Sequence, residues 1–140
     1  MKIKIYLSLI ALLISVLTAS AQKIKLKDDK VYVDGSYLMD YESKLMLNEF
    51  YLLKEGEELV MVLWNDNGTR EYKEDDFMTI HFLKEDIKVE THRTRMRKGI
   101  VKWLLSGDVL TSDGQVVKEK AELFYKKFDE KITERTIISR

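Results

Sequence analysis

The chain has no cysteine and no proline, only two histidines, and six glycines among its 140 residues. Without cysteine it forms no disulfide, zinc–thiolate site or thiol nucleophile, and no lipid can be attached to a cysteine behind a leader. The absence of proline argues against extended linkers and proline-rich ligand segments. The scattered glycines form no phosphate-binding loop. Stability must therefore come from the burial of apolar side chains.

The first 21 residues have the three parts of a secretory signal peptide. Lys2 and Lys4 give a positive start, an almost unbroken apolar run covers Ile5–Leu17, and Ala19-Ser20-Ala21 supplies small residues for a signal peptidase. We expect cleavage between Ala21 and Gln22, because the run is shorter than the roughly 20 residues that span a bilayer. The alternative is an uncleaved membrane anchor. After cleavage the protein is expected to be periplasmic or secreted, and to have touched a membrane only through its signal peptide.

The Ala-Ser-Ala-Gln ending resembles the signal peptides of small exported proteins of Bacteroidota-type Gram-negative bacteria. This resemblance covers only the leader, residues 1–21, and implies a compartment rather than an activity. Residues 22–140 are long enough for a single α+β domain with a core. Their net charge is about −2, which indicates no binding of polyanions through bulk charge. Because export separates the protein from cytosolic DNA, we expect no nucleic-acid partner.

The pattern of the mature chain changes once, from strands over about 23–92 to helices over about 95–130, with a ragged tail over about 131–140. Asp34-Gly35 separates two strand-like runs and predicts a two-residue type I′ hairpin turn. Short successive strands with short turns favour an antiparallel β-meander of about five or six strands, followed by two packed C-terminal helices. The further strands are expected at 47–53, 58–65, 77–83 and 87–91.

The run Leu59–Trp64 is apolar at every position. Since alternate residues of a strand face opposite sides, it predicts a central strand covered on both faces, with Leu63 and Trp64 both buried. Two apolar stripes at helical spacing can supply the cover. They are Met96, Ile100, Trp103 and Leu104 in the first helix, and Val117, Ala121, Phe124 and Phe128 in the second.

The sequence shows no recognised arrangement for metal binding or catalysis. His81 and His92 have no further ligands at metal-binding spacing, whereas a zinc or copper site needs three or four. Neither a G-x-S-x-G elbow nor an S-x-x-K motif with its K-T-G partner occurs. We therefore predict no metal, no cofactor and no catalytic residue.

The densest basic run, His92 to Lys98, lies where strands give way to helices. Its charged side chains could form an anion patch for a phosphate, a sulfate or an acidic polymer. The alternative is a solvated junction paired with acidic neighbours such as Glu71, Glu74, Asp75 and Asp76. The members of this predicted patch are His92, Arg93, Arg95, Arg97 and Lys98.

Aromatic side chains also gather around the Asp34-Gly35 turn. A regular register continued from this turn places Tyr32, Tyr37 and Tyr41 on one face of the hairpin. An exposed tyrosine face would suit stacking on a sugar or contact with a protein, because tyrosine has a flat apolar ring and a polar tip. The alternative is that a C-terminal helix covers this face.

These patterns favour an exported, non-enzymatic binding or interaction module of the cell envelope or exterior, with a protein or a glycan as partner. The alternative is a small periplasmic hydrolase that acts on cell-wall or polysaccharide substrates. An enzyme needs a concave pocket with converging ionisable groups, whereas a binding module needs an exposed apolar patch.

Overall fold

A computed structural model describes residues 21–66, 68 and 71–137. The leader segment 1–20 therefore lies outside the described residues. Within the described part, no helix has both the length and the apolar character that a membrane crossing requires. The strands are β1 (Ile24–Lys27), β2 (Lys30–Val33), β3 (Ser36–Lys44), β4 (Glu49–Lys54), β5 (Glu57–Asn65), β6 (Phe77–Phe82) and β7 (Ile87–Thr91). The helices are α2 (Arg97–Ser106), α3 (Lys118–Phe128) and α4 (Ile132–Ile137), with short 3₁₀ turns η1 (Leu45–Leu47) and η2 (Lys73–Asp75).

The seven strands form one antiparallel sheet in the order β1 to β7, so each strand pairs only with its neighbours in the chain. The predicted α+β meander followed by C-terminal helices is confirmed. The strand beyond the expected five or six is β1, whose apolar side chains at Ile24 and Leu26 pack against the core while its lysines stay exposed. The tail expected to be ragged contains the short helix α4.

Tight turns set the meander, as the sequence indicates. Asp34 and Gly35 have φ angles of 50° and 85°, and Glu55 and Gly56 have φ angles of 52° and 79°. Positive φ at both central residues is the requirement of a type I′ turn, whose twist matches that of the adjoining strands. The predicted hairpin is confirmed at its tip, where Val33 pairs with Ser36.

The predicted register of this hairpin holds for one further pair of residues and is wrong beyond that pair. Tyr32 pairs with Tyr37, but Val31 pairs with Met39 rather than with Leu38, because the register shifts between Val31 and Tyr32. A bulge puts one extra residue in β3 and exchanges the faces that follow it. Met39 is consequently buried in the core instead of lying beside Tyr37.

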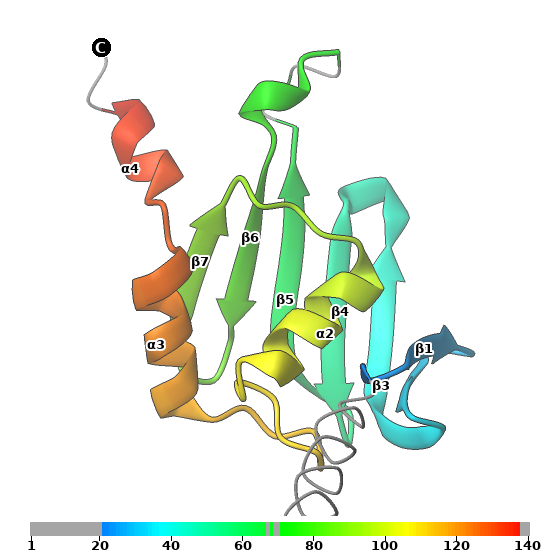
Figure 1. Ribbon diagram of the computed structural model, residues 1–140. Coiled ribbons are helices and arrows are strands. Elements are labelled where there is room, and N and C mark those ends of the chain that lie inside the picture. Colours follow the sequence, from blue (N-terminus) through cyan, green and yellow to red (C-terminus); the bar gives the residue numbers. More distant parts are fainter. Residues whose placement is uncertain (1–20, 67, 69–70, 138–140) are drawn as a thin grey trace, which may run out of the picture.

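One face of the sheet carries the core. Val60, Val62 and Ile80 are fully buried there, together with Ile100 of α2 and Phe124 of α3. Figure 1 shows α2 crossing in front of β4 and β5 while α3 runs beside β7. The prediction that β5 is covered on both faces is wrong for the described residues. Met61 and Leu63 on the other face are half-buried, and Trp64 is half-buried too.

The two long helices meet in an aromatic joint, which we define as Trp103, Phe124 and Phe128. The ring centroid of Trp103 lies 4.7 Å from the centroid of each phenylalanine ring, and the centroids of the two phenylalanine rings lie 4.8 Å apart. Phe124 also meets Phe82 of the sheet edge-on. The helical stripes predict this contact. Their first residues lie outside the helices, because Met96 precedes α2 and is exposed, and Val117 precedes α3 and is half-buried.

The edge of β7 is closed by hydrogen bonds to the part of the chain that follows α3. We call this group of residues the edge clamp: Glu90, His92, Asp129, Glu130 and Thr133. Asp129 Oδ1 accepts a hydrogen bond from the Glu90 amide at 2.9 Å, and the Glu130 amide donates to the Glu90 carbonyl at 2.8 Å. The buried Glu90 carboxylate accepts hydrogen bonds from the amide and the hydroxyl of Thr133, at 2.9 and 2.8 Å. The clamp therefore pairs groups that an edge strand would otherwise leave open to another chain.

Candidate functional site

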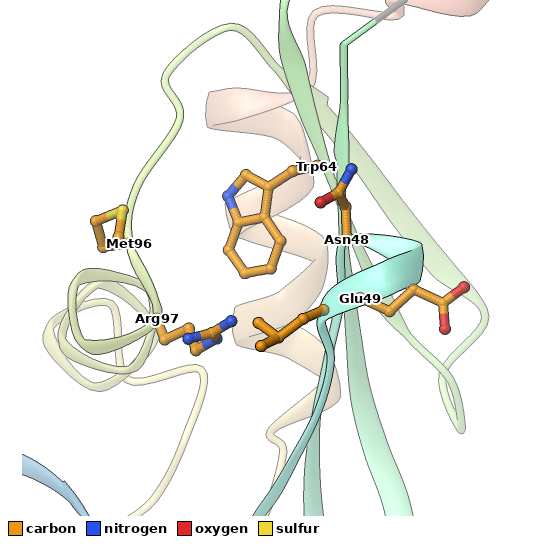
Figure 2. A pocket seen from close by; sticks show the side chains of 6 residues that line it. Asn48, Glu49, Trp64, Met96 and Arg97 are labelled. Carbon is orange, nitrogen blue, oxygen red and sulfur yellow. The ribbon is translucent and has the colours of Figure 1, made fainter.

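A cleft opens at the end of the sheet where the β3–β4 connection approaches the start of α2 (Figure 2). Its volume is about 210 Å³. Residues from η1, β4, β5 and α2 contribute to it, so it lies beside the core-bearing face rather than within the core. The lining residues are Leu45, Asn48, Glu49, Trp64, Met96 and Arg97.

The β3–β4 connection forms one wall. Leu45–Leu47 makes a 3₁₀ turn, and Asn48 ends it in the left-handed conformation with φ 54°. Asparagine tolerates that conformation better than most residues, because its short polar side chain can bond locally. The Asn48 carbonyl accepts a hydrogen bond from the Trp64 amide at 3.1 Å. This bond ties the connection to β5.

The same connection presents a group of exposed apolar side chains, which we call the apolar rim. Met46 is 97% exposed and Met96, across the cleft, is 81% exposed. Leu45 and Leu47 are 69% and 58% exposed. The rim consists of Leu45, Met46, Leu47 and Met96. The sequence analysis assigned Leu47 to a strand and Met96 to a buried stripe. The signal it missed was three successive apolar residues between Lys44 and Asn48.

Trp64 forms another wall of the cleft. Its ring lies 6.3 Å from that of Phe50, and its Nε1 donates a hydrogen bond to the Arg95 carbonyl at 3.0 Å. Core packing and one hydrogen bond thus fix the indole at both ends. Figure 2 shows its ring beside the cleft, opposite Arg97. An indole held in this way offers a rigid apolar surface with little entropy left to lose on binding.

Two ionisable side chains line the cleft, and they point in different directions (Figure 2). Glu49 extends away from Trp64, and its carboxylate accepts a hydrogen bond from the Tyr51 hydroxyl at 2.8 Å. That hydrogen bond, followed by burial, raises the pKa of Tyr51 to about 12. Arg97 extends into the space below the indole, and its Nε is buried without a hydrogen-bond partner. None of the salt bridges among the described residues involves Arg97.

The predicted anion patch is divided by the fold. The Arg95 guanidinium stacks on Trp103 at 3.7 Å from the ring centroid, and the Arg93 guanidinium lies 5.9 Å from the Phe128 ring. Desolvation and then the charge of Arg93 lower the pKa of Arg95. These two arginines therefore pack on the aromatic joint, and only Arg97 of the predicted set lines the cleft.

The outer members of the run also lie apart from the cleft. The His92 amide donates to Glu130 Oε2 at 2.7 Å, and its Nδ1 lies 3.3 Å from Glu130 Oε1. Burial alone would raise the pKa of Glu130, but hydrogen bonds from Thr91 and His92 outweigh it and lower that pKa. Lys98 is exposed on α2. His92 thus belongs to the edge clamp.

The predicted tyrosine face is also divided. Tyr32 and Tyr37 meet edge-on with ring centroids 6.4 Å apart, and Tyr37 is 46% exposed. Tyr41 is on the other face, where its ring packs 5.8 Å from Phe50, because the bulge reverses the faces. The Tyr37 hydroxyl donates to Asp40 at 3.1 Å; burial, and then this hydrogen bond, raise the pKa of Tyr37.

A second hollow, of about 420 Å³, lies beside Tyr32. Its walls include Lys23, Lys25 and Lys27, which alternate with apolar residues and so share one side of β1. The strict alternation of lysine with Ile24 and Leu26 was the available signal, and the sequence analysis did not use it. Asp28 also lines this hollow, so its walls carry three basic side chains and one acidic side chain.

The two histidines lie in separate environments. His81 Nε2 is 3.3 Å from Asp86, whereas His92 contacts Glu130. In the part of the chain that the structure describes, no three histidine or acidic side chains are grouped as metal ligands. Comparison with known proteins finds no matching family model, no matching curated protein and no matching solved structure.

Proposed function

We propose that this protein is exported and acts as a non-enzymatic binding module of the cell envelope or exterior, with the cleft and its apolar rim as the binding surface. The leader pattern of residues 1–21 supports export. The partner is a protein, because an exposed apolar patch with a polar surround is typical of protein contact.

The observation that carries this proposal is the exposure of the apolar rim. Single exposed apolar residues are ordinary, but here two large ones, Leu45 and Met96, line one cleft, and Met46 and Leu47 follow Leu45 directly in the chain. Methionine adapts its shape to a partner surface, and two of the four rim residues are methionines. Folding gains little from side chains left this open to water, so their concentration in one place favours a role in contact with another molecule.

The hydrolase alternative has less support from the same cleft. General acid–base catalysis needs ionisable groups that converge on one point. Of the two ionisable side chains at the cleft, Glu49 points away and is held by Tyr51, and Arg97 stands alone beneath Trp64. The geometry therefore favours recognition over proton transfer.

The binding proposal can be tested by site-specific photo-crosslinking in the host. A photoreactive amino acid is placed at Met46 in the full chain, and at Leu123 as a matched apolar control that is exposed on α3. We expect an adduct from position 46 that disappears when Met96 is also changed to Ser, and no such adduct from position 123. Equal crosslinking from both positions, or none from either, would refute the proposed surface.

Export is tested separately by the intact mass of the protein recovered from the host envelope or medium. We expect the chain to begin at Gln22, with or without cyclisation to pyroglutamate. Exported protein that retains residues 1–21 would contradict the predicted cleavage.

A further inference from the structure

The cleft has features that go beyond general apolar contact. We propose that it binds the C-terminal residue of a partner polypeptide, with an apolar side chain against Trp64 and the terminal carboxylate on Arg97. This inference rests on the proposed binding function, and it adds the chemistry of the ligand.

The size of the cleft favours a single residue. Its volume of about 210 Å³ is smaller than that of the pockets of about 300–1,000 Å³ that take drug-sized ligands, so a small group such as one side chain suits it better than a larger ligand.

The charge of the cleft favours a carboxylate. The Arg97 guanidinium has five donors in a planar fork that matches a carboxylate with two parallel hydrogen bonds. Its Nε is already out of contact with water and has no partner. Because this Nε is closed to water, it is closed to a ligand as well, and a carboxylate in the cleft would bind the other nitrogens of the Arg97 guanidinium. The other ionisable side chain at the cleft, Glu49, points away and hydrogen-bonds Tyr51.

The apolar rim fits the residues that precede a chain end. Leu45 and Met96 both line the cleft, and Met46 and Leu47 follow Leu45 in the chain, so a polypeptide leaving the cleft would meet these exposed apolar side chains. Capture of a terminal carboxylate combined with a side-chain pocket is a known mode of peptide recognition. A membrane surface would engage the tip at Met46, but it would leave the Trp64–Arg97 pair unexplained.

The test is a binding measurement on the exported protein, purified from a host that expresses the full chain. The probes are dye-labelled glycine–serine peptides that end in leucine or phenylalanine, each with a free carboxylate or an amide at its end. Fluorescence anisotropy should show binding of the free acids. Binding of the amides should be at least about tenfold weaker, because they lack the charged partner.

Two variants assign that effect to Arg97. Arg97→Gln should weaken binding of the free acids by at least about tenfold and leave the amides unchanged. The matched control is Lys98→Gln, which removes the neighbouring exposed charge and should leave binding of the acids unchanged. Equal thermal unfolding of both variants and the parent protein establishes that the fold is intact.

Three results would overturn the inference. They are equal affinity for acid and amide peptides, no binding by any peptide of the panel, and binding to phosphatidylglycerol vesicles that requires Met46 but not Arg97. Either of the first two results would leave the proposed binding function in place if crosslinking from position 46 is unchanged by Arg97→Gln. Loss of the crosslink itself would remove both proposals.

Discussion

The region beside β7 and the region beside the β3–β4 connection differ in whether their buried polar groups have hydrogen-bond partners. On the β7 side, the edge clamp gives the Glu90 carboxylate two hydrogen bonds from Thr133, and the aromatic joint fixes α3 against the strands. On the β3–β4 side, the Arg97 guanidinium enters an apolar cleft with no partner for its Nε. Paired groups stabilise the fold, whereas a buried group without a hydrogen-bond partner destabilises it.

This contrast indicates where the molecule is built for stability and where for binding. The clamp buries an acidic side chain that is only 8% exposed, which is tolerated because its hydrogen bonds are satisfied. The apolar rim beside the cleft instead keeps four large apolar side chains exposed to water. Substitutions on the two sides should therefore have opposite signs, and four measurements test this, from the largest effect to the smallest.

The largest effect is expected at the aromatic joint. Phe124→Ala removes a buried ring that contacts Trp103, Phe128 and Phe82, and should lower the free energy of unfolding by about 3–5 kcal/mol. Urea denaturation measures the change. The control is the adjacent exposed residue, Leu123→Ala, which should change stability by less than about 0.5 kcal/mol. Similar values for the two variants would mean that α3 is not anchored to the sheet.

A smaller loss is expected when the clamp loses its acceptor. Glu90→Gln places an amide NH₂ against one of the two Thr133 donors, so one buried hydrogen bond is lost. We expect a loss of about 1–3 kcal/mol in the free energy of unfolding. Glu122→Gln on the exposed side of α3 serves as the control and should have no measurable effect. An unchanged Glu90→Gln variant would show that α4 is not held by this carboxylate.

The clamp should also make stability depend on pH. The pKa of Glu130 is lower in the folded protein than its ordinary value, so its contribution is complete above that ordinary value and is lost as pH falls through the folded value. The unfolding free energy should therefore fall between about pH 5 and pH 3 more steeply in the parent protein than in Glu130→Gln. Parallel curves for the two proteins would contradict this role.

The smallest effect, with the opposite sign, is expected at the cleft. Arg97→Met removes a guanidinium whose Nε is buried and unpaired, so stability should stay constant or rise by up to about 1 kcal/mol. Arg95→Met is the matched control, because it loses its stacking on Trp103 and should destabilise by about 0.5–1 kcal/mol. A marked loss in Arg97→Met would show that Arg97 supports the fold.

Much of the fold could be predicted from local patterns. The Asp34-Gly35 turn, strand β5 and helices α2 and α3 each depend on near neighbours in the sequence, and each lies where it was expected, although Leu63 and Trp64 are only half-buried and Met96 precedes α2. The bulge beside Tyr37 could not be predicted from the turn. A two-residue turn determines the pairing of the residues next to it, but an extra residue inserted further along one strand changes the pairing that follows. That one insertion moved Tyr41 from the predicted tyrosine face to the face of the core.

Most of the candidate site could not be predicted from the sequence. The anion patch grouped Arg93, Arg95 and Arg97 by adjacency, but the chain enters α2 there and two of the three arginines turn onto aromatic rings. The cleft combines η1, β5 and α2, whose residues are widely separated along the chain. No local pattern places Leu45 beside Trp64, and only the packing of α2 on the sheet places Arg97 beneath that indole.

The strictly sequential order of the strands has a consequence for how the chain assembles. Each strand pairs with the one before it, so loop closures are short and the sheet can grow from β1 towards β7. A chain that crosses a membrane N-terminus first would form its sheet before α2 and α3 emerge. During that interval Val60, Val62 and Ile80 would lack the helices that later cover them. In such a chain, α2 and α3 in the last third of the sequence would be the late-forming cover that protects the sheet from aggregation.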